Sequence, residues 1–98
     1  MFWKNDFMAK MRSVWAENID KFQYEISGQW VDAAINSKVI DNDIIRLIVQ
    51  LPGTDAVTIT GARILDADGT VIGESAENIT NSGGKGLISQ WEFPVYEK

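Results

Sequence analysis

Cysteine and histidine are both absent from the 98 residues of this chain. Without cysteine there is no disulfide, no thiolate zinc site and no cysteine nucleophile. Without histidine the chain lacks the usual general base near neutral pH, the serine–histidine–aspartate arrangement and the commonest transition-metal ligand. Because most hydrolytic mechanisms depend on these groups, we expect a protein that is not an enzyme and that uses no metal and no cofactor.

Basic residues and long hydrophobic runs are also scarce. The chain has 9 lysines and arginines against 14 aspartates and glutamates, which gives a net charge of −5. Binding to a phosphate backbone requires a basic excess that displaces counterions, so we expect no nucleic-acid partner. Apolar runs such as Leu47 to Val49 are far too short to span a membrane, and "MFWKNDFMAKM" lacks the pattern of a secretory signal. We therefore expect a soluble protein, cytoplasmic as synthesised, with no membrane partner.

The chain length of 98 residues is that of one domain with a single core. Within it, the first 18 residues differ in pattern from the rest. At 100° per residue, one arc of about 140° over residues 3 to 17 collects most of the large apolar side chains, and the opposite side is polar. We therefore expect an amphipathic helix within residues 1–18, with an apolar face formed by Trp3, Phe7, Met8, Met11, Val14 and Trp15.

From Asp20 onward the hydrophobic period changes to two, which is typical of strands. Aromatic and charged residues alternate in "DKFQYEIS", Gly28 interrupts the pattern, and "QWVDAAI" resumes it. "DIIRLIVQL" has the pattern of a central strand, and Pro52-Gly53 predicts a turn after it. "AVTIT" and "ARILD" follow, with Gly61 between them as a bulge or bend.

The C-terminal part is predicted to hold a polar loop and a last strand. Residues 75–86, "SAENITNSGGKG", are small and polar and indicate a surface loop. In the final stretch, "LISQWEFPVYEK", alternate residues are apolar, and we expect Trp91 to lie in or beside the core. Pro94 cannot donate to a ladder, which places this strand at a sheet edge or directs that position to solvent.

The stretch "ILDADGTVIGE" allows two interpretations, a calcium loop and a strand-to-strand turn. An EF-hand loop needs glycine at position 6 and glutamate at position 12. Counting from Asp66, glycine falls at position 4 and Glu77 at position 12, so the register fails at the glycine. A hairpin accounts for every residue, with Asp66 and Asp68 in a type I turn and Gly69 in the left-handed bulge position. We interpret Asp66, Asp68 and Gly69 as a structural turn.

Two other stretches suggest site chemistry and also have simpler explanations. Asp41 and Asp43 could be half of an acid–base pair, but aspartate before a strand favours a turn through its own backbone hydrogen bonds. "NSGGKG" departs from the phosphate-binding template GxxxxGK[ST] and is typical of a hairpin loop. Neither stretch provides a catalytic residue.

About six short strands separated by turn signals predict a mainly β fold. We expect an antiparallel immunoglobulin-like β-sandwich over residues 19–98, preceded by the N-terminal helix. The alternative is an α+β domain in which the helix packs on one sheet face. Both architectures contain the hairpin at residues 62–73.

The stretches "VTITGARILDADGTVIGE" and "GLISQWEFPV" resemble the accessory β-sandwich domains of tailed-phage and prophage virion proteins, including baseplate upper protein N-terminal domains. The resemblance covers residues 44–96 and rests on a strand, a DG hairpin and a late strand that ends in an aromatic-proline stretch. It implies a structural or attachment role and association with a virion. It carries over no catalytic residue.

These observations favour a non-enzymatic structural or protein-interaction module that assembles through its N-terminal helix. The expected partner is a protein, either a different one or a second copy of this chain, which would make a homo-oligomer. The alternative is a carbohydrate- or peptide-binding module that uses an aromatic sheet face. An enzyme that relies on carboxylates alone is a third, less favoured interpretation. An oligomer with the helix at its interface would support the first hypothesis, and an exposed row of coplanar aromatic rings would support the second.

Overall fold

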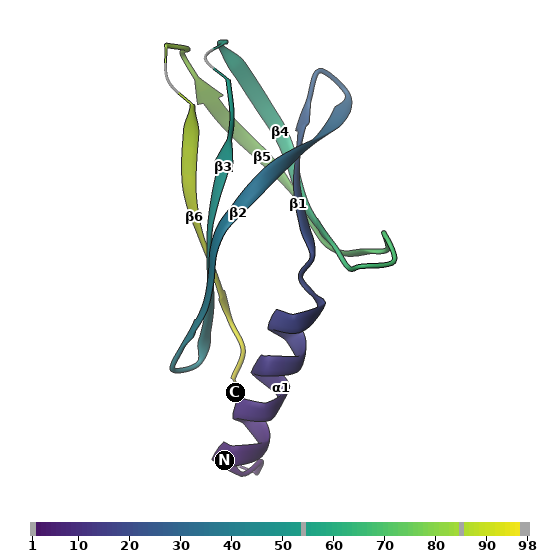
Figure 1. The fold of residues 1–98 in the computed structure, drawn as a ribbon, viewed down its shortest axis with the longest axis vertical. Helices are drawn as coiled ribbons and strands as arrows, with labels where there is room; N and C mark the ends of the chain where they lie inside the picture. The colour runs from purple at the N-terminus through teal and green to yellow at the C-terminus, as the bar shows by residue number, and fades with distance from the viewer. Residues whose placement is uncertain (1, 54, 85, 97–98) are drawn as a thin grey trace.

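The computed structural model describes residues 2–53, 55–84 and 86–96, which form one helix and six strands (Figure 1). The helix lies at one end of the molecule and the strands form the rest. In chain order the elements are α1 (Asn5–Asn18), β1 (Lys21–Ile26), β2 (Gln29–Asp41), β3 (Ile44–Leu51), β4 (Val57–Leu65), β5 (Val71–Asn81) and β6 (Leu87–Pro94).

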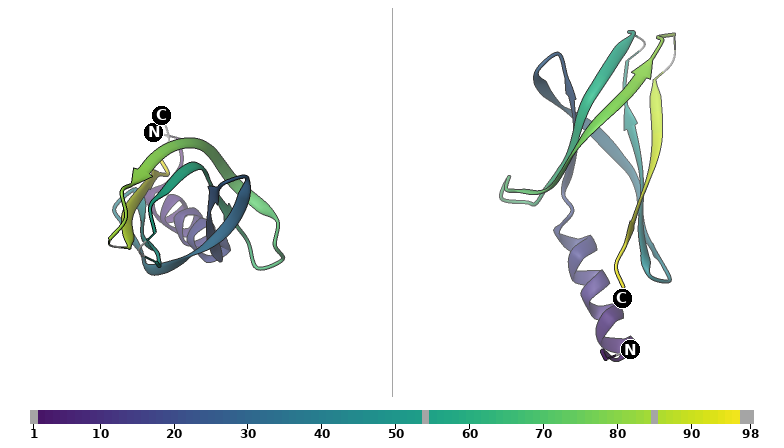
Figure 2. Two further views of the ribbon diagram at one scale, coloured as in Figure 1. Left: turned by 90° about the horizontal axis from the view of Figure 1, so that it is seen from above. Right: turned by 180° about the vertical axis from the view of Figure 1, so that it is seen from behind.

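The strands form a single antiparallel sheet with the order β5-β4-β1-β2-β3-β6. The mainly β class, the six strands and the N-terminal helix are therefore confirmed. The sheet does not divide into the two layers of the expected sandwich. It curls on itself, as the view from above shows (Figure 2). The 13-residue strand β2 makes this possible because it pairs with β1 along its first half and with β3 along its second half.

The core lies on the concave side of the curled sheet. Alternation along each strand places every second side chain there. In β3 the odd-numbered residues from Ile45 to Leu51 are buried, and in β1 Phe22 and Tyr24 are buried. β4 contributes Ile59 and Ala62, between which the register shifts at Gly61. The bulge predicted at Gly61 is thus present, and it changes which residues of β4 face inward.

Helix α1 continues into the sheet through Ile19 and Asp20. The helix ends because Ile19 has an extended backbone, and the N–H of Ile19 donates to the carbonyl oxygen of Ala16 at 3.2 Å. The N–H of Asp20 then donates to the carbonyl of Leu65 on β4 at 3.0 Å. Lys38 of β2 donates from Nζ to the Ile19 carbonyl at 2.9 Å. These contacts hold the junction between the helix and the sheet.

The expectation of a loop over residues 75–86 is wrong for its first part. β5 continues to Asn81, and Thr80 and Ile79 pair with Thr58 and Ile59 of β4. The composition of "SAENITN" is unfavourable for a strand, but pairing with an adjacent strand and partial burial outweigh intrinsic β-propensity. The last strand is at a sheet edge, as Pro94 predicts.

Candidate functional site

The apolar face predicted for the helix divides into a packed part and an exposed part. Met8 and Met11 are half-buried, and Ala16 is buried against the core. The other four residues of the predicted face remain open to solvent. Their exposed fractions are 48% for Trp3, 42% for Phe7, 40% for Val14 and 59% for Trp15.

Aromatic residues just before and within the first turn of α1 contact one another. The rings of Trp3 and Phe7 are stacked with centroids 5.2 Å apart, and Phe2 meets Trp3 edge to face at 4.8 Å. The other side of the helix is held by Arg12, whose Nε donates to the carbonyl oxygen of Val95 at 2.8 Å. In both side views the helix extends away from the sheet, so much of its length has no strand beside it (Figures 1 and 2). Trp3 was expected on the helix but lies before its first residue, Asn5. We call Trp3, Phe7, Val14 and Trp15 the exposed helix face.

A groove continues this face onto the sheet. It is lined by Val14, Trp15, Asn18 and Ile72, and its volume is about 300 Å³. Ile72 and its neighbour Val71 are exposed apolar residues at the start of β5. The apolar surface of the helix is therefore contiguous with the hairpin between β4 and β5, which contains Asp66 and Gly69.

The hairpin at residues 65–71 has the predicted turn geometry. Gly69 has φ +82°, and its N–H donates to the carbonyl of Asp66 at 3.0 Å. The Asp66 carboxylate accepts hydrogen bonds from the N–H groups of Asp68 and Thr70 at 3.0 and 2.9 Å. Within the described residues there is no group of three or more side chains that could hold a metal ion. Asp66 thus acts as a turn residue.

The other acidic and glycine-rich stretches have ordinary surroundings. Asp41 lies 3.2 Å from Arg46 in an exposed ion pair, and Asp43 accepts a backbone hydrogen bond from Val95 at 2.7 Å through its carbonyl oxygen. In "NSGGKG", Lys85 lies outside the described residues, and Gly83 and Gly84 have positive φ. No described feature of either stretch provides acid–base or phosphate chemistry.

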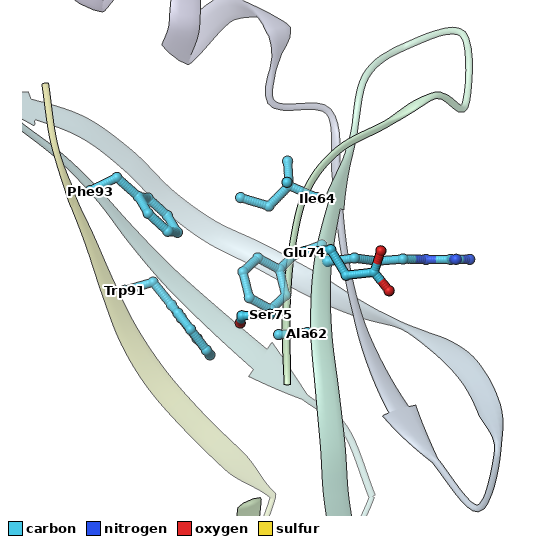
Figure 3. A pocket seen from close by; sticks show the side chains of 9 residues that line it. Ala62, Ile64, Glu74, Ser75, Trp91 and Phe93 are labelled. Atoms are coloured by element: carbon cyan, nitrogen blue, oxygen red, sulfur yellow. The ribbon is translucent and has the colours of Figure 1, made fainter. Parts of the chain in front are cut away.

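A second candidate site lies in the gap between the two edge strands. β5 and β6 are the ends of the sheet, and the curl brings them to opposite sides of one apolar slot of about 110 Å³ (Figure 3). Trp91 and Phe93 extend from β6 toward Ala62 and Ile64 of β4. Residues that line the slot are Phe22, Ala62, Arg63, Ile64, Gly73, Glu74, Ser75, Trp91 and Phe93.

Aromatic rings form most of one side of this slot. The planes of Trp91 and Phe93 are 15° apart with centroids at 6.4 Å, and the Phe22 ring is 5.2 Å from that of Trp91. The Trp91 indole N–H donates to the hydroxyl oxygen of Tyr24 at 2.9 Å. The expectation that Trp91 lies in or beside the core is confirmed, because it packs against the buried cluster while remaining partly open.

The slot exists because β5 contributes small side chains at this point. Gly73 is opposite Ile64, and Ser75 is opposite Ala62, so Gly73 and Ser75 share the concave face with buried Ala62. Neither residue is large enough to reach the aromatic rings on β6. Sequence reasoning missed the slot because Ser75 fell in a stretch assigned to a loop and because the opposition of Gly73 and Ser75 to Trp91 depends on the curl.

The convex face of the sheet carries a different aromatic arrangement. The guanidinium of Arg63 lies 4.2 Å above the ring centroid of Trp30, and Arg63 Nε donates to Gln23 Oε1 at 2.8 Å. Gly61 lies under the edge of the Trp30 ring. Trp30 therefore stacks on its own neighbours on the convex face, and its ring does not join the concave row formed by Trp91 and Phe93.

Comparisons of the chain with protein-family models, with curated proteins and with solved structures each found no match. Among the residues described, no helix combines the length and the apolar character needed to cross a bilayer.

Proposed function

We propose that this chain is a non-enzymatic structural or interaction module that assembles through α1, with a second copy of the chain as its partner. The observation that carries the proposal is the exposed helix face, in which four large apolar side chains are 40% to 59% exposed. Contiguous apolar surface of this kind marks interaction sites in soluble proteins. The groove lined by Val14, Trp15 and Ile72 extends the same surface toward β5.

Intramolecular packing does not account for this surface. Beside this surface, α1 already contacts its own chain through Ala16, which is buried in the core, and through Arg12, which donates to the Val95 carbonyl. With these contacts in place, Trp3, Phe7, Val14 and Trp15 are still 40% to 59% exposed, and a second molecule would cover them.

A second copy fits the spacing of the exposed residues. In an antiparallel pairing of two α1 helices centred between Lys10 and Met11, Phe7 of each copy lies opposite Val14 of the other. The two residues are equally far from that centre and project from nearly the same side of the helix, because they are seven positions apart. A pairing about a two-fold axis uses the same surface twice and closes at two copies.

The resemblance of residues 44–96 to accessory domains of phage virion proteins supports a structural or attachment role, with a place in the virion. In this proposal the sheet provides the surface for attachment, and α1 binds the second copy of the chain.

The test is the solution mass at tens of micromolar, measured by light scattering after size exclusion. We expect twice the 11.0 kDa chain mass for the wild type. Trp3→Ala combined with Phe7→Ala should give the mass of one chain, with the β-sheet circular dichroism unchanged because the core lies in the sheet. Ile88→Ala is the matched control, since Ile88 is an apolar residue of β6 that is 64% exposed.

A single-chain mass for the wild type would remove self-assembly. A double-chain mass that persists in the helix variant, or that is lost in Ile88→Ala alone, would place the interface on the sheet instead of the helix.

A further inference from the structure

We propose that the slot between β5 and β6 binds one aromatic ring of a small molecule whose substituent is neutral or cationic. The proposal is independent of assembly through α1, because the slot is lined by residues of β1, β4, β5 and β6 and by none of the helix. It concerns the concave side of the sheet, where Phe22, Tyr24, Trp91 and Phe93 pack together.

The size of the slot selects a single ring. Its volume is about 110 Å³. An apolar protein cavity of roughly 150 Å³ is known to hold benzene, so a six-membered ring nearly fills a space of this order and a bicyclic ring system exceeds it. Because the slot is open to solvent between the two edge strands, a substituent on the ring can extend outward.

The lining selects an aromatic ring and excludes a sugar. Phe22, Trp91 and Phe93 present ring faces and edges, and Ala62 and Ile64 complete an apolar surface. Aromatic rings gain from offset or edge-to-face contact beyond the area that they bury. A pyranose would place hydroxyl groups against these walls without hydrogen-bond partners, which is costly.

The charges near the slot select against an anionic substituent. Ser75 lines the slot, and its hydroxyl donates to the carboxylate of Glu77 at 3.0 Å. Glu74 of β5 and Glu92 of β6 lie on the opposite strand faces from Ser75 and Trp91, and Glu92 lies 3.6 Å from Arg46. Neither strand contains a lysine or an arginine.

The one cationic side chain in the lining is directed elsewhere. The guanidinium of Arg63 is over Trp30 on the convex face, and its Nε is bound to Gln23. The Glu74 carboxylate also points away from Trp91 and Phe93 (Figure 3). A carboxylate on the ligand would therefore emerge beside Ser75 and Glu77 with no cation to meet it, whereas an ammonium or a hydroxyl group would be accepted.

The experiment uses the full chain labelled with ¹⁵N and three probes of matched shape, 2-phenylethanol, 2-phenylethylamine and phenylacetate. The reporter is the indole N–H signal of Trp91, assigned by its loss in Trp91→Phe. We expect saturable shifts with the alcohol and the amine, and an affinity for phenylacetate that is several-fold weaker. Since screening shortens the reach of exposed charges, the difference between amine and carboxylate should shrink in about 1 M salt, where the Debye length is about 3 Å.

A blocking variant separates binding in the slot from binding elsewhere. At Gly73 an added Cβ meets nothing within 4 Å, and the backbone φ is not in the left-handed region. Gly73→Leu should therefore fold, place its side chain over the slot and abolish the shifts. Thr80→Leu, which adds the same side chain to the opposite face of β5, should bind like the wild type. If Gly73→Leu lowers the melting temperature below that of Thr80→Leu, Ser75→Leu serves as the second blocking variant.

Three results would overturn the proposal. The first is the absence of a saturable Trp91 shift with any of the probes at millimolar concentration. The second is undiminished binding in both blocking variants, and the third is tighter binding of phenylacetate than of the alcohol.

Discussion

The indole N–H of Trp91 donates a hydrogen bond to the hydroxyl oxygen of Tyr24 at 2.9 Å, and this bond joins two strands that are not neighbours in the sheet. β2 and β3 lie between β1 and β6 in the strand order. The bond therefore crosses the inside of the curl and links β1 directly to β6, which strand pairing does not do.

Removing this acceptor should destabilise the fold. Tyr24 is fully buried, and Tyr24→Phe leaves the Trp91 N–H without its partner, which costs about 1 to 2 kcal/mol for an unsatisfied donor. The measurement is the free energy of unfolding from urea titration. Tyr96→Phe is the control, since Tyr96 is half exposed and should change the free energy by much less. Equal effects of the two substitutions would show that the hydrogen bond contributes nothing.

The turn between β4 and β5 should depend on the backbone of Gly69. Its φ of +82° is disfavoured for a residue with a Cβ, so Gly69→Val should cost about 1 to 2 kcal/mol. Ala67→Val, two positions earlier in the turn, should be tolerated. Denaturant midpoints of the two variants give the comparison, and an unchanged midpoint for Gly69→Val would contradict the turn assignment.

Calcium should not stabilise this turn. The Asp66 carboxylate is occupied by the N–H groups of Asp68 and Thr70, which is the usual role of aspartate in such turns. Thermal melts in millimolar calcium and in chelator should coincide. Asp66→Ala should lower the melting temperature in both solutions alike, and a rise of several degrees with calcium in the wild type would show that the loop binds the ion.

Added side chains at two glycines in adjacent strands should change the free energy of unfolding in opposite directions. A Cβ on Gly61 would lie 3.0 Å from Cη2 of Trp30 and 3.4 Å from Glu25, so Gly61→Val should displace the Trp30 ring and cost about 1 to 3 kcal/mol. A Cβ on Gly73 would have no neighbour within 4 Å. Gly73→Ala should therefore stabilise the protein by about 0.5 to 1 kcal/mol, because glycine loses more conformational freedom than alanine on folding. Urea titrations measure both changes, and a destabilised Gly73→Ala would show that this position has a constraint besides its neighbours.

Local sequence pattern was sufficient to predict β1, β3 and the hairpin between β4 and β5. The alternation in "FQYEI" and "IIRLIVQL" predicted which residues of β1 and β3 are buried, and the turn residues Asp66 and Gly69 predicted the hairpin. In each case the physical cause lies within a few residues along the chain. Pro94 similarly predicted an edge strand from its missing donor.

Features that depend on distant strands were not predictable from local pattern. Residues 75–81 are small and polar, and they form a strand because β4 offers paired backbone groups beside them. The single curled sheet requires β2 to bend between the half that pairs with β1 and the half that pairs with β3. The alternation of polar and apolar residues in β2 does not reveal this bend. The slot follows from both, since it requires Gly73 and Ser75 on one edge and Trp91 on the other.

The strand order also constrains how the chain acquires its structure during synthesis. β1, β2 and β3 can pair as soon as residue 51 is made, but β1 remains an open edge until β4 is complete at Leu65. β6 must pair with β3 across more than thirty intervening residues, a non-local contact that slows folding. Until residues 87–94 arrive, Tyr24 and Phe22 have no Trp91 to cover them, so the nascent chain presents an aromatic surface that only its last strand conceals.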